Sequence, residues 1–546
     1  MDDDDRDSNA SSENDQNDQN DQNDQDEVME DVDDADGDME NDEEDNDDDQ
    51  DDNDREETGD DAQEKGDEAA ARDAREPSRE GSASARASPE GKGKSPIPFS
   101  SLFPTVRPEA VRARLYDIVP TMAAPQATSI NAIAITPDLR YWMTGGSDGY
   151  IRKYDGPGTI NGKQLLTVAQ RHPFVDSVVK AGILMSYWEN EEPGPPNPRG
   201  NEEHVLSPVY SLAVHSQALW LLSGLESGGI NLQSVRHDEG KRITCLQQHT
   251  NAVSVLTLAQ DEKSVLSGSW DKNIYDWDLN TGGVKRSFDG SGGQTSAIEL
   301  RPVNGAPIPA DAMEEDIKFD EGAKDAEAPP PVSDFPDIPP VPDVQPDDPA
   351  PGSPSMVFVS EPAVPAMDPT QSADTIFFSA AIDGNIRLWD RRVQDPVARI
   401  SNQRGVPPWC MGACWSPDGN WIYAGRRNGT VEEYSIHKAR SGWAPERTLK
   451  FPAGSGAVSA VRAMPNGRHL VCASHDILRL YDLKDTRAFK HSTVPFLIIP
   501  GPPRAGVISS LYIDRTCRFM LSAAGTRGWE GTSTEVLIGY EIGVTE

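Results

Sequence analysis

The chain has 546 residues and a formal net charge of −42 at neutral pH. Its five cysteines are scattered and odd in number, which argues against a disulfide framework and favours a reducing compartment. No apolar run reaches the roughly 18 residues that a membrane-spanning helix requires, so we expect no membrane association.

The acidic charge lies in two segments. Residues 1–70 hold 36 acidic residues against 3 basic ones, and residues 302–374 hold 16 against 2. The first segment is almost free of apolar residues and cannot bury enough surface to offset chain entropy, so residues 1–70 are predicted to form a disordered acidic tail. Such a tail is either a solvating appendage or a polyanion that binds a basic partner, and both readings stay open.

Residues 71–128 are interpreted as a linker and a lead-in to the folded part. Their first thirty residues are rich in serine, proline and glycine, a composition typical of flexible linkers. A comparable break occurs at residues 303–373, where prolines are frequent and cannot donate to a strand ladder. We therefore expect an extended, disordered insertion there, within the fourth of the repeats described next.

A pattern recurs through residues 129–542. Each copy has an alternating apolar run, a polar turn, a second run ending in small residues, a tight turn with Asp or Asn, and a third run closing in an aromatic residue. Alternation of period two with frequent turn signals predicts strands. A spacing near 45 residues between closing aromatics is the length of a four-stranded propeller blade. Seven copies begin at residues 129, 208, 252, 295, 410, 457 and 507.

Two copies close in a Trp-Asp pair, Trp277-Asp278 and Trp389-Asp390, and an aspartate stands six residues before each tryptophan. With these motifs the chain resembles the WD-repeat family over residues 129–542. The resemblance implies an all-β, seven-bladed WD-repeat β-propeller. It also implies a structural hydrogen-bond network inside the blades, because a buried indole N–H and a buried carboxylate each need a partner. The expected network residues are Asp148, His249, Asp271, Trp277, Asp383 and Trp389.

The same resemblance implies that turns between the second and third strands emerge on one face, called the narrow face here. Aromatic and arginine residues dominate binding hot spots, so those near these turns are candidates for contacting a partner. Each is equally compatible with an isolated surface residue. The candidates are Tyr150, Trp270, Arg426, Arg427 and Trp529.

Motifs for catalysis are missing from the sequence. The nine histidines show no metal-ligand spacing, and no nucleophile elbow, Walker or dinucleotide-binding motif stands in a strand–turn–helix context. We therefore expect a protein that is not an enzyme, with no catalytic residues, no metal, no cofactor and no small-molecule substrate.

A closer resemblance rests on "NAIAITPDLRYWMTGGSDGYIRKYD" and "LSGSWDKNIYDWDLNTG" together with the acidic N-terminal segment. These stretches are similar to the WD-repeat subunits of the fungal SAGA transcription coactivator. That resemblance implies a nuclear scaffold that binds the TATA-binding protein and other coactivator subunits, regulates delivery of the TATA-binding protein to promoters, and does not itself bind DNA sequence-specifically.

Two other functions stay open on the residues alone. The stretch "WDRR", which ends at Arg392, fits the WD-x-Arg pattern of substrate receptors of cullin-type ubiquitin ligases. A histone-binding propeller is the second alternative, because an acidic tail suits a basic partner.

Overall fold

The computed structural model describes residues 104–194, 205–309, 372–402, 409–439, 443–475, 477–484, 496–501, 506–529, 532 and 534–545. All of them belong to one compact unit, residues 92–546. The predicted acidic tail 1–70, the linker up to residue 103 and residues 310–371 of the predicted insertion lie outside the described residues.

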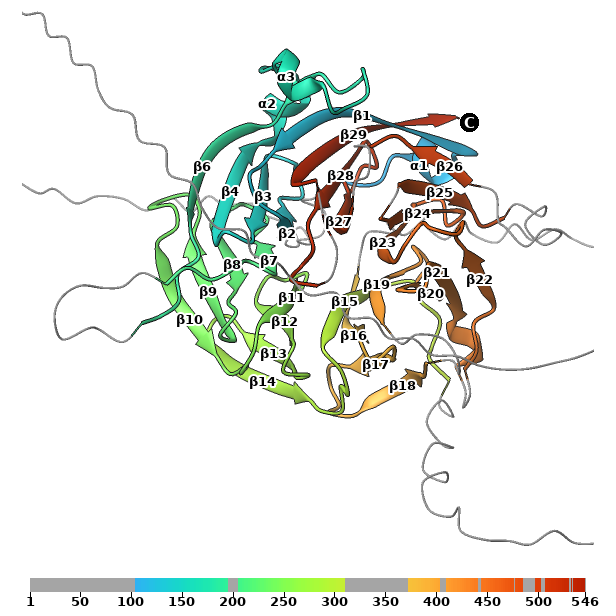
Figure 1. Cartoon of the computed structure of the whole chain (residues 1–546). Coiled ribbons are helices and arrows are strands. Elements are labelled where there is room, and N and C mark those ends of the chain that lie inside the picture. Colours follow the sequence, from blue (N-terminus) through green and yellow to red (C-terminus); the bar gives the residue numbers. More distant parts are fainter. Residues whose placement is uncertain are drawn as a thin grey trace, which may run out of the picture. The chain divides into compact units, whose positions relative to one another are not determined.

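Seven antiparallel sheets are arranged around a central axis, as Figure 1 shows. The prediction of an all-β, seven-bladed propeller is confirmed. Within each blade the first strand lies nearest the axis, and consecutive strands pair outward from it. Blade one contains β2 (Ile130–Ile135), β3 (Tyr141–Gly146), β4 (Tyr150–Asp155) and β6 (Ile183–Glu189). Blade two contains β7 (Leu212–Val214), β8 (Trp220–Gly224), β9 (Gly229–Ser234) and β10 (Arg242–Gln247).

The next four blades follow the same order. Blade three contains β11 (Val253–Leu258), β12 (Ser264–Ser269), β13 (Ile274–Asp278) and β14 (Gly283–Phe288). Blade four contains β15 (Thr295–Pro302), β16 (Ser372–Ala381), β17 (Ile386–Asp390) and β18 (Pro396–Ile400). Blade five contains β19 (Cys410–Trp415), β20 (Trp421–Arg426), β21 (Thr430–Ser435) and β22 (Arg447–Lys450), with a short 3-10 helix η3 (Ile436–Lys438) after β21. Blade six contains β23 (Val458–Ala463), β24 (His469–Ser474), β25 (Leu478–Asp482) and β26 (Phe496–Ile499).

Blade seven joins the two ends of the described chain. Its first three strands are β27 (Ile508–Ile513), β28 (Phe519–Ala524) and β29 (Val536–Thr545). The fourth is β1 (Leu115–Pro125), which pairs antiparallel with β29 from Leu115 opposite Thr545 to Pro125 opposite Val536. This pairing closes the ring. β1 falls within the predicted lead-in 71–128, because its partner strand lies some 420 residues away and no local repeat marks it.

Short elements decorate this ring. Helix α1 (Pro108–Arg112) precedes β1. Helices α2 (Gly156–Ile160) and α3 (Val168–Arg171) lie between the third and fourth strands of blade one, and β5 (Lys180–Ala181) adds to β1 in parallel.

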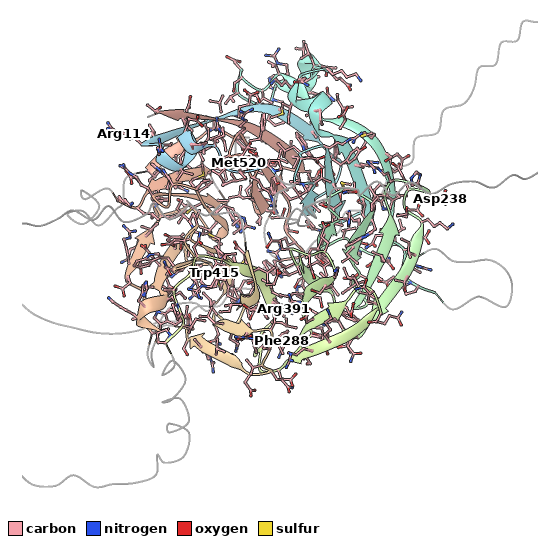
Figure 2. All side chains as sticks on the ribbon, turned by 180° about the vertical axis from the view of Figure 1, so that it is seen from behind. Arg114, Asp238, Phe288, Arg391, Trp415 and Met520 are labelled. Carbon is pink, nitrogen blue, oxygen red and sulfur yellow. The ribbon has the colours of Figure 1, made fainter. Side chains whose placement is uncertain are left out.

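The core lies within and between the blades. The closing aromatics Trp277, Trp389, Tyr434 and Tyr481 are all at most 2% exposed. Trp389 packs against Phe288 of the preceding blade at 5.6 Å between ring centroids. Neighbouring blades are also joined by charge: the guanidinium of Arg391, labelled in Figure 2 near Phe288, donates to Asp276 Oδ1 of blade three at 2.6 Å.

The predicted insertion 303–373 lies between two strands of blade four, and its last two residues belong to the second of them. Its flanking strands β15 and β16 are the first and second strands of the blade, and Thr295 pairs opposite Ala381. The two strands pair across the 69 residues that separate Pro302 from Ser372, because closing a longer loop costs little additional free energy.

Candidate partner-binding face

A continuous hydrogen-bond network runs through blade three. Trp277 Nε1 donates to Ser267 Oγ at 2.8 Å, and Ser267 Oγ lies 2.7 Å from His249 Nε2. His249 Nδ1 lies 2.9 Å from Asp271 Oδ2. A carboxylate only accepts, so the proton on the imidazole is assigned to Nδ1, and Ser267 donates to Nε2. The structure thus links the tryptophan of the third strand to the aspartate of the tight turn through His249.

Asp271 also holds backbone groups of its own blade. Its carboxylate accepts from Thr250 N at 2.9 Å and from Asn273 N at 2.8 Å. Burial raises the pKa of this carboxyl, but the hydrogen bonds that it accepts from His249, Asn273 N and Thr250 N outweigh burial and lower the pKa to about 2. Asp271 therefore stays ionised and fixes the turn together with the loop that leads into β11.

Blades one and four keep the turn aspartate but replace the histidine. In blade four, Trp389 Nε1 donates to Ser379 Oγ at 2.8 Å, while Asp383 accepts from Arg387 Nη2 at 3.2 Å. In blade one, Asp148 is paired with Arg152. The six predicted network residues therefore occur in two different arrangements, and within the described residues only blade three links its aspartate to its tryptophan.

The structure corrects the expectation for Arg426, which is 0% exposed. Its Nε donates to Glu432 Oε2 at 2.7 Å, and its Nη1 donates to the carbonyl of Gly384 in blade four at 2.7 Å. Arg426 ends β20 with its side chain turned into the blade, whereas the next residue, Arg427, begins the exposed turn. The guanidinium of Arg426 is thus a structural cation and is not presented to a partner.

Trp270 lies in the turn between β12 and β13 of blade three. Its ring packs on Tyr210 at 5.0 Å between centroids. Gly528, from the turn between β28 and β29, lies against both rings so closely that an added Cβ would come within 2.9 Å of each. Trp529 follows directly in the same turn. Three aromatic side chains from blades two, three and seven therefore gather around this glycine's turn.

Arg527 of that turn reaches into the central channel. The channel is a cavity of about 520 Å³ lined by all seven innermost strands. Arg527 Nη2 donates to the carbonyls of Ser296 at 2.9 Å and Ser254 at 3.4 Å, and its backbone N–H donates to Asn131 Oδ1 at 3.0 Å. Burial, with a smaller contribution from Arg462, lowers the pKa of Arg527 to about 10, so it remains cationic at neutral pH.

These contacts fix the blade-seven turn across the ring. Arg527 adopts a left-handed φ of 54°, which is unfavourable for a residue with a Cβ, and its bonds to blades one, three and four hold it there. Its guanidinium lies 4.6 Å from the centroid of the Trp529 ring. Trp529 therefore lies next to an arginine whose contacts fix the turn between β28 and β29.

Two indole groups on this face lack the partners that buried polar groups normally have. Trp270 Nε1 and Trp529 Nε1 are both buried, and neither has a hydrogen-bond partner among the described residues. Buried donors are satisfied in the great majority of cases. An acceptor from a bound partner would complete both.

The remaining candidates lie apart from this centre. Arg427 is exposed and lies over the ring of Trp409 in blade five, 4.1 Å from its centroid. Tyr150 packs edge-on against Tyr187 at 5.9 Å, at the outer side of blade one. The five predicted residues therefore form no single patch: Trp270 and Trp529 lie near one turn, and Arg426, Arg427 and Tyr150 lie elsewhere.

Sequence reasoning missed Tyr210, Trp409 and Arg527. Tyr210 and Trp409 precede the first strands of their blades, in loops that return to the same face. Arg527 stands in "GTRGWEG", within a turn between β28 and β29 that is longer than its counterparts. The length of this turn and its flanking glycines were the signal that could have identified it.

Other functional classes find little support at their expected residues. Arg392, the basic residue of the ubiquitin-receptor pattern, is exposed and pairs with Asp390 at 2.6 Å within its own turn. Across the described ranges, no group of three or more His, Cys, Asp or Glu side chains is arranged to hold a metal ion. No helix in the described part of the chain is long and apolar enough to span a membrane.

The seven blades, the Trp–Ser–His–Asp network and the Trp-Asp endings define a WD-repeat propeller protein. Residues 116–543 match the family described as the SPT8 β-propeller. The chain belongs to this family.

Curated relatives cover most of the chain. The SAGA complex subunit Spt8 of Schizosaccharomyces pombe is 47% identical over 452 residues, which is 80% of this chain and 81% of the relative. The SAGA complex subunit SPT8 of Saccharomyces cerevisiae is 39% identical over 452 residues, 78% of this chain and 72% of the relative.

Proposed function

We propose that this protein is a non-catalytic interaction subunit of a nuclear SAGA-type transcription coactivator, and that it binds the TATA-binding protein and regulates its delivery to promoters. The observation that carries the proposal is the family match across the whole propeller, together with relatives named as SAGA complex subunits. A propeller with a rigid interaction face suits a scaffold, because its turns present side chains from several blades at once.

Two parts of the chain are proposed to share the contact. The TATA-binding protein presents a basic DNA-binding surface, and residues 1–70 carry a net charge of −33. The narrow face offers aromatic groups around Trp270 and Trp529 with buried indole donors that need acceptors. Attraction to the tail is Coulombic, whereas the aromatic contact depends on desolvation, and salt screens only the first strongly.

The salt dependence of binding tests whether the tail and the narrow face both contribute to the contact. Fragment 1–100, the full chain and a variant lacking residues 1–70 are titrated with the TATA-binding protein at low and high salt. We expect binding of fragment 1–100 to weaken steeply with salt and to be displaced by DNA, while the tail-less variant binds with a shallower salt dependence. Equal affinity and equal salt dependence with and without the tail would make residues 1–70 a solvating appendage only.

The narrow face is tested by substitution within the full chain. We expect Trp270→Ala to weaken binding of the TATA-binding protein, with Arg392→Ala as the matched control on an exposed turn elsewhere. Core histones are titrated in parallel. Tighter capture of histones than of the TATA-binding protein would favour the histone-binding alternative, and loss of ligase-adaptor capture on Arg392→Ala would favour the ubiquitin-receptor alternative.

A further inference from the structure

The outermost strands of the blades differ in how they are protected. An exposed strand edge is a template for pairing with another chain, and proteins usually protect it with charges or proline. Strands β10, β14, β18 and β22 each carry arginine or lysine. Strand β6, with the sequence ILMSYWE, carries no charge before its last residue.

Strand β6 also exposes large apolar side chains. Leu184 is 47% exposed, Met185 50% and Tyr187 64%. β6 is the last strand of its sheet and pairs with β4, and among the described strands none pairs with its other edge; Gln233 Nε2 of blade two donates to the carbonyl of Glu189 at the end of β6 at 3.0 Å. β26 is similarly apolar, with Ile498 61% exposed, and it serves below as the comparison strand.

A polar groove adjoins β6. It has a volume of about 660 Å³ and lies between the outer part of blade one and blade two, whose outer strands β6 and β10 are neighbours on the rim in Figure 1. Tyr150 and Tyr187 line it, and so do the carboxylates of Glu189 and Glu239. The hydroxyl of Tyr150 donates to Glu189 Oε1 at 3.0 Å, which orients this carboxylate beside the aromatic pair.

The groove contains a buried acceptor that has no donor. Asn231 is 0% exposed and lines the groove. Its Nδ2 donates to Asn190 Oδ1 at 3.2 Å and to the carbonyl of Glu191 at 2.9 Å, and because both are acceptors the orientation of the amide is fixed. Its Oδ1 has no partner among the described residues. A buried amide oxygen of this kind calls for a donor.

The cations already present at the groove have other partners. Lys241 pairs at 3.5 Å with Asp238, which Figure 2 labels, and Lys153, which does not line the groove, pairs with the lining carboxylate of Glu239. Arg242 Nη1 donates to the carbonyl of Glu191 at 3.4 Å. The groove therefore favours an incoming ammonium or guanidinium group over an anion, because it offers the carboxylate of Glu189, the Oδ1 of Asn231 and the two tyrosine rings.

We propose that β6 and this groove form a docking site for an extended segment of another protein subunit, with apolar side chains against β6 and a lysine or arginine in the groove. The proposal rests on the proposed function, because it assigns the surface that anchors this chain in its assembly. Charge excludes the chain's own tail 1–70 and insertion 303–373 as occupants, since both are strongly acidic. The contact joins strand addition, which supplies affinity, to a charged pocket, which supplies register.

Photo-crosslinking in the purified complex identifies the occupant. A benzophenone amino acid replaces Tyr187 in the full chain, and a second preparation carries it at Ile498 on β26 as the matched control. We expect Tyr187 to crosslink to a segment of another subunit that contains alternating apolar residues and a lysine or arginine, and Ile498 not to reach that segment. Crosslinks to residues 71–100 of the same chain, to an acidic segment only, or to nothing would overturn the proposal.

Substitutions supply the energetic test. The double variant Met185→Lys, Tyr187→Asp is expected to lower incorporation into the complex at least 10-fold, with an unchanged melting temperature because both side chains are exposed. Val284→Lys on β14 is the control and should incorporate normally. Unchanged incorporation of the double variant would overturn the proposal.

A charge exchange then tests the groove itself. Glu189→Lys should weaken incorporation, and replacement of the crosslinked basic residue by glutamate should restore it in that background; no restoration would remove Glu189 from the site. Binding of the TATA-binding protein to the isolated chain is measured for the same variants. Loss of incorporation with retained binding separates this docking site from the proposed function, whereas loss of both with normal melting would place both activities on one surface and overturn the separate anchor.

Discussion

Blades three and five solve the same packing problem with different chemistry. In blade three the second strand ends with Ser267 and Ser269, and the network runs through neutral groups to the ionised Asp271. In blade five, Ala424 stands at the position of Ser267, and Arg426 at that of Ser269. In blade five the buried polar side chains at this place therefore form an ion pair between Arg426 and Glu432.

The difference shows which part of a repeat the fold dictates. Each blade must satisfy polar groups between its second and third strands, near the turn that meets the neighbouring blade. Blade three uses a histidine from the preceding loop, whereas blade five reaches the carbonyl of Gly384 in blade four with its own arginine. The position is shared, but the residues that fill it vary, so sequence motifs mark only some of the blades.

Removing the blade-five cation should have the largest effect on stability. Arg426→Ala leaves Glu432 buried without its guanidinium and also removes the bond to blade four. Breaking a buried ion pair typically costs about 3–5 kcal/mol, and we expect a loss of that size in the free energy of unfolding by urea denaturation. The double variant Arg426→Met, Glu432→Leu should recover much of it; a double variant no more stable than Arg426→Ala would show that packing, not the unpaired charge, sets the loss.

Removing the blade-three carboxylate should cost less. Asp271→Ala leaves the imidazole N–H of His249 and two backbone donors without their acceptor, at about 1–3 kcal/mol. The loss should appear in thermal melting, with partner binding preserved below the transition. Normal melting combined with lost partner binding would contradict the architectural role of Asp271.

The same carboxylate gives blade three a pH dependence. Its pKa falls from an ordinary 3.8 to about 2 in the folded protein, so the native state favours the ionised form. Its contribution is fully present above pH 3.8 and is lost as the pH falls from there toward 2. The difference amounts to about 2 kcal/mol. The unfolding free energies of the parent and Asp271→Asn should therefore converge over this range; a constant gap between pH 5 and 2.5 would contradict the assignment.

The residues that could be predicted from the sequence are those that recur at the same place in several repeats. The Trp-Asp ending located Trp277, and the six-residue spacing located Asp271. Ser267, which joins Trp277 to His249, could not be singled out, because serine is frequent in strands that end in small residues. Arg426 was misplaced because a one-residue step at a strand end moves a side chain from one face to the other, and two consecutive arginines give no sign of which one points inward.

Substitution of Arg427 should have the smallest effect on stability, and it can be compared directly with substitution of its neighbour Arg426. Arg427 follows Arg426 directly, yet it is exposed, and its guanidinium lies over the ring of Trp409. An exposed cation–π contact contributes about 0.5–1 kcal/mol, so Arg427→Ala should reduce the unfolding free energy by no more than that, several-fold less than Arg426→Ala. Trp409→Ala measures the pair from its other side, and a double-mutant cycle isolates their coupling. Equal losses for the two arginines would mean that Arg427 also supports the blade, and the distinction between a structural and a surface arginine would fail.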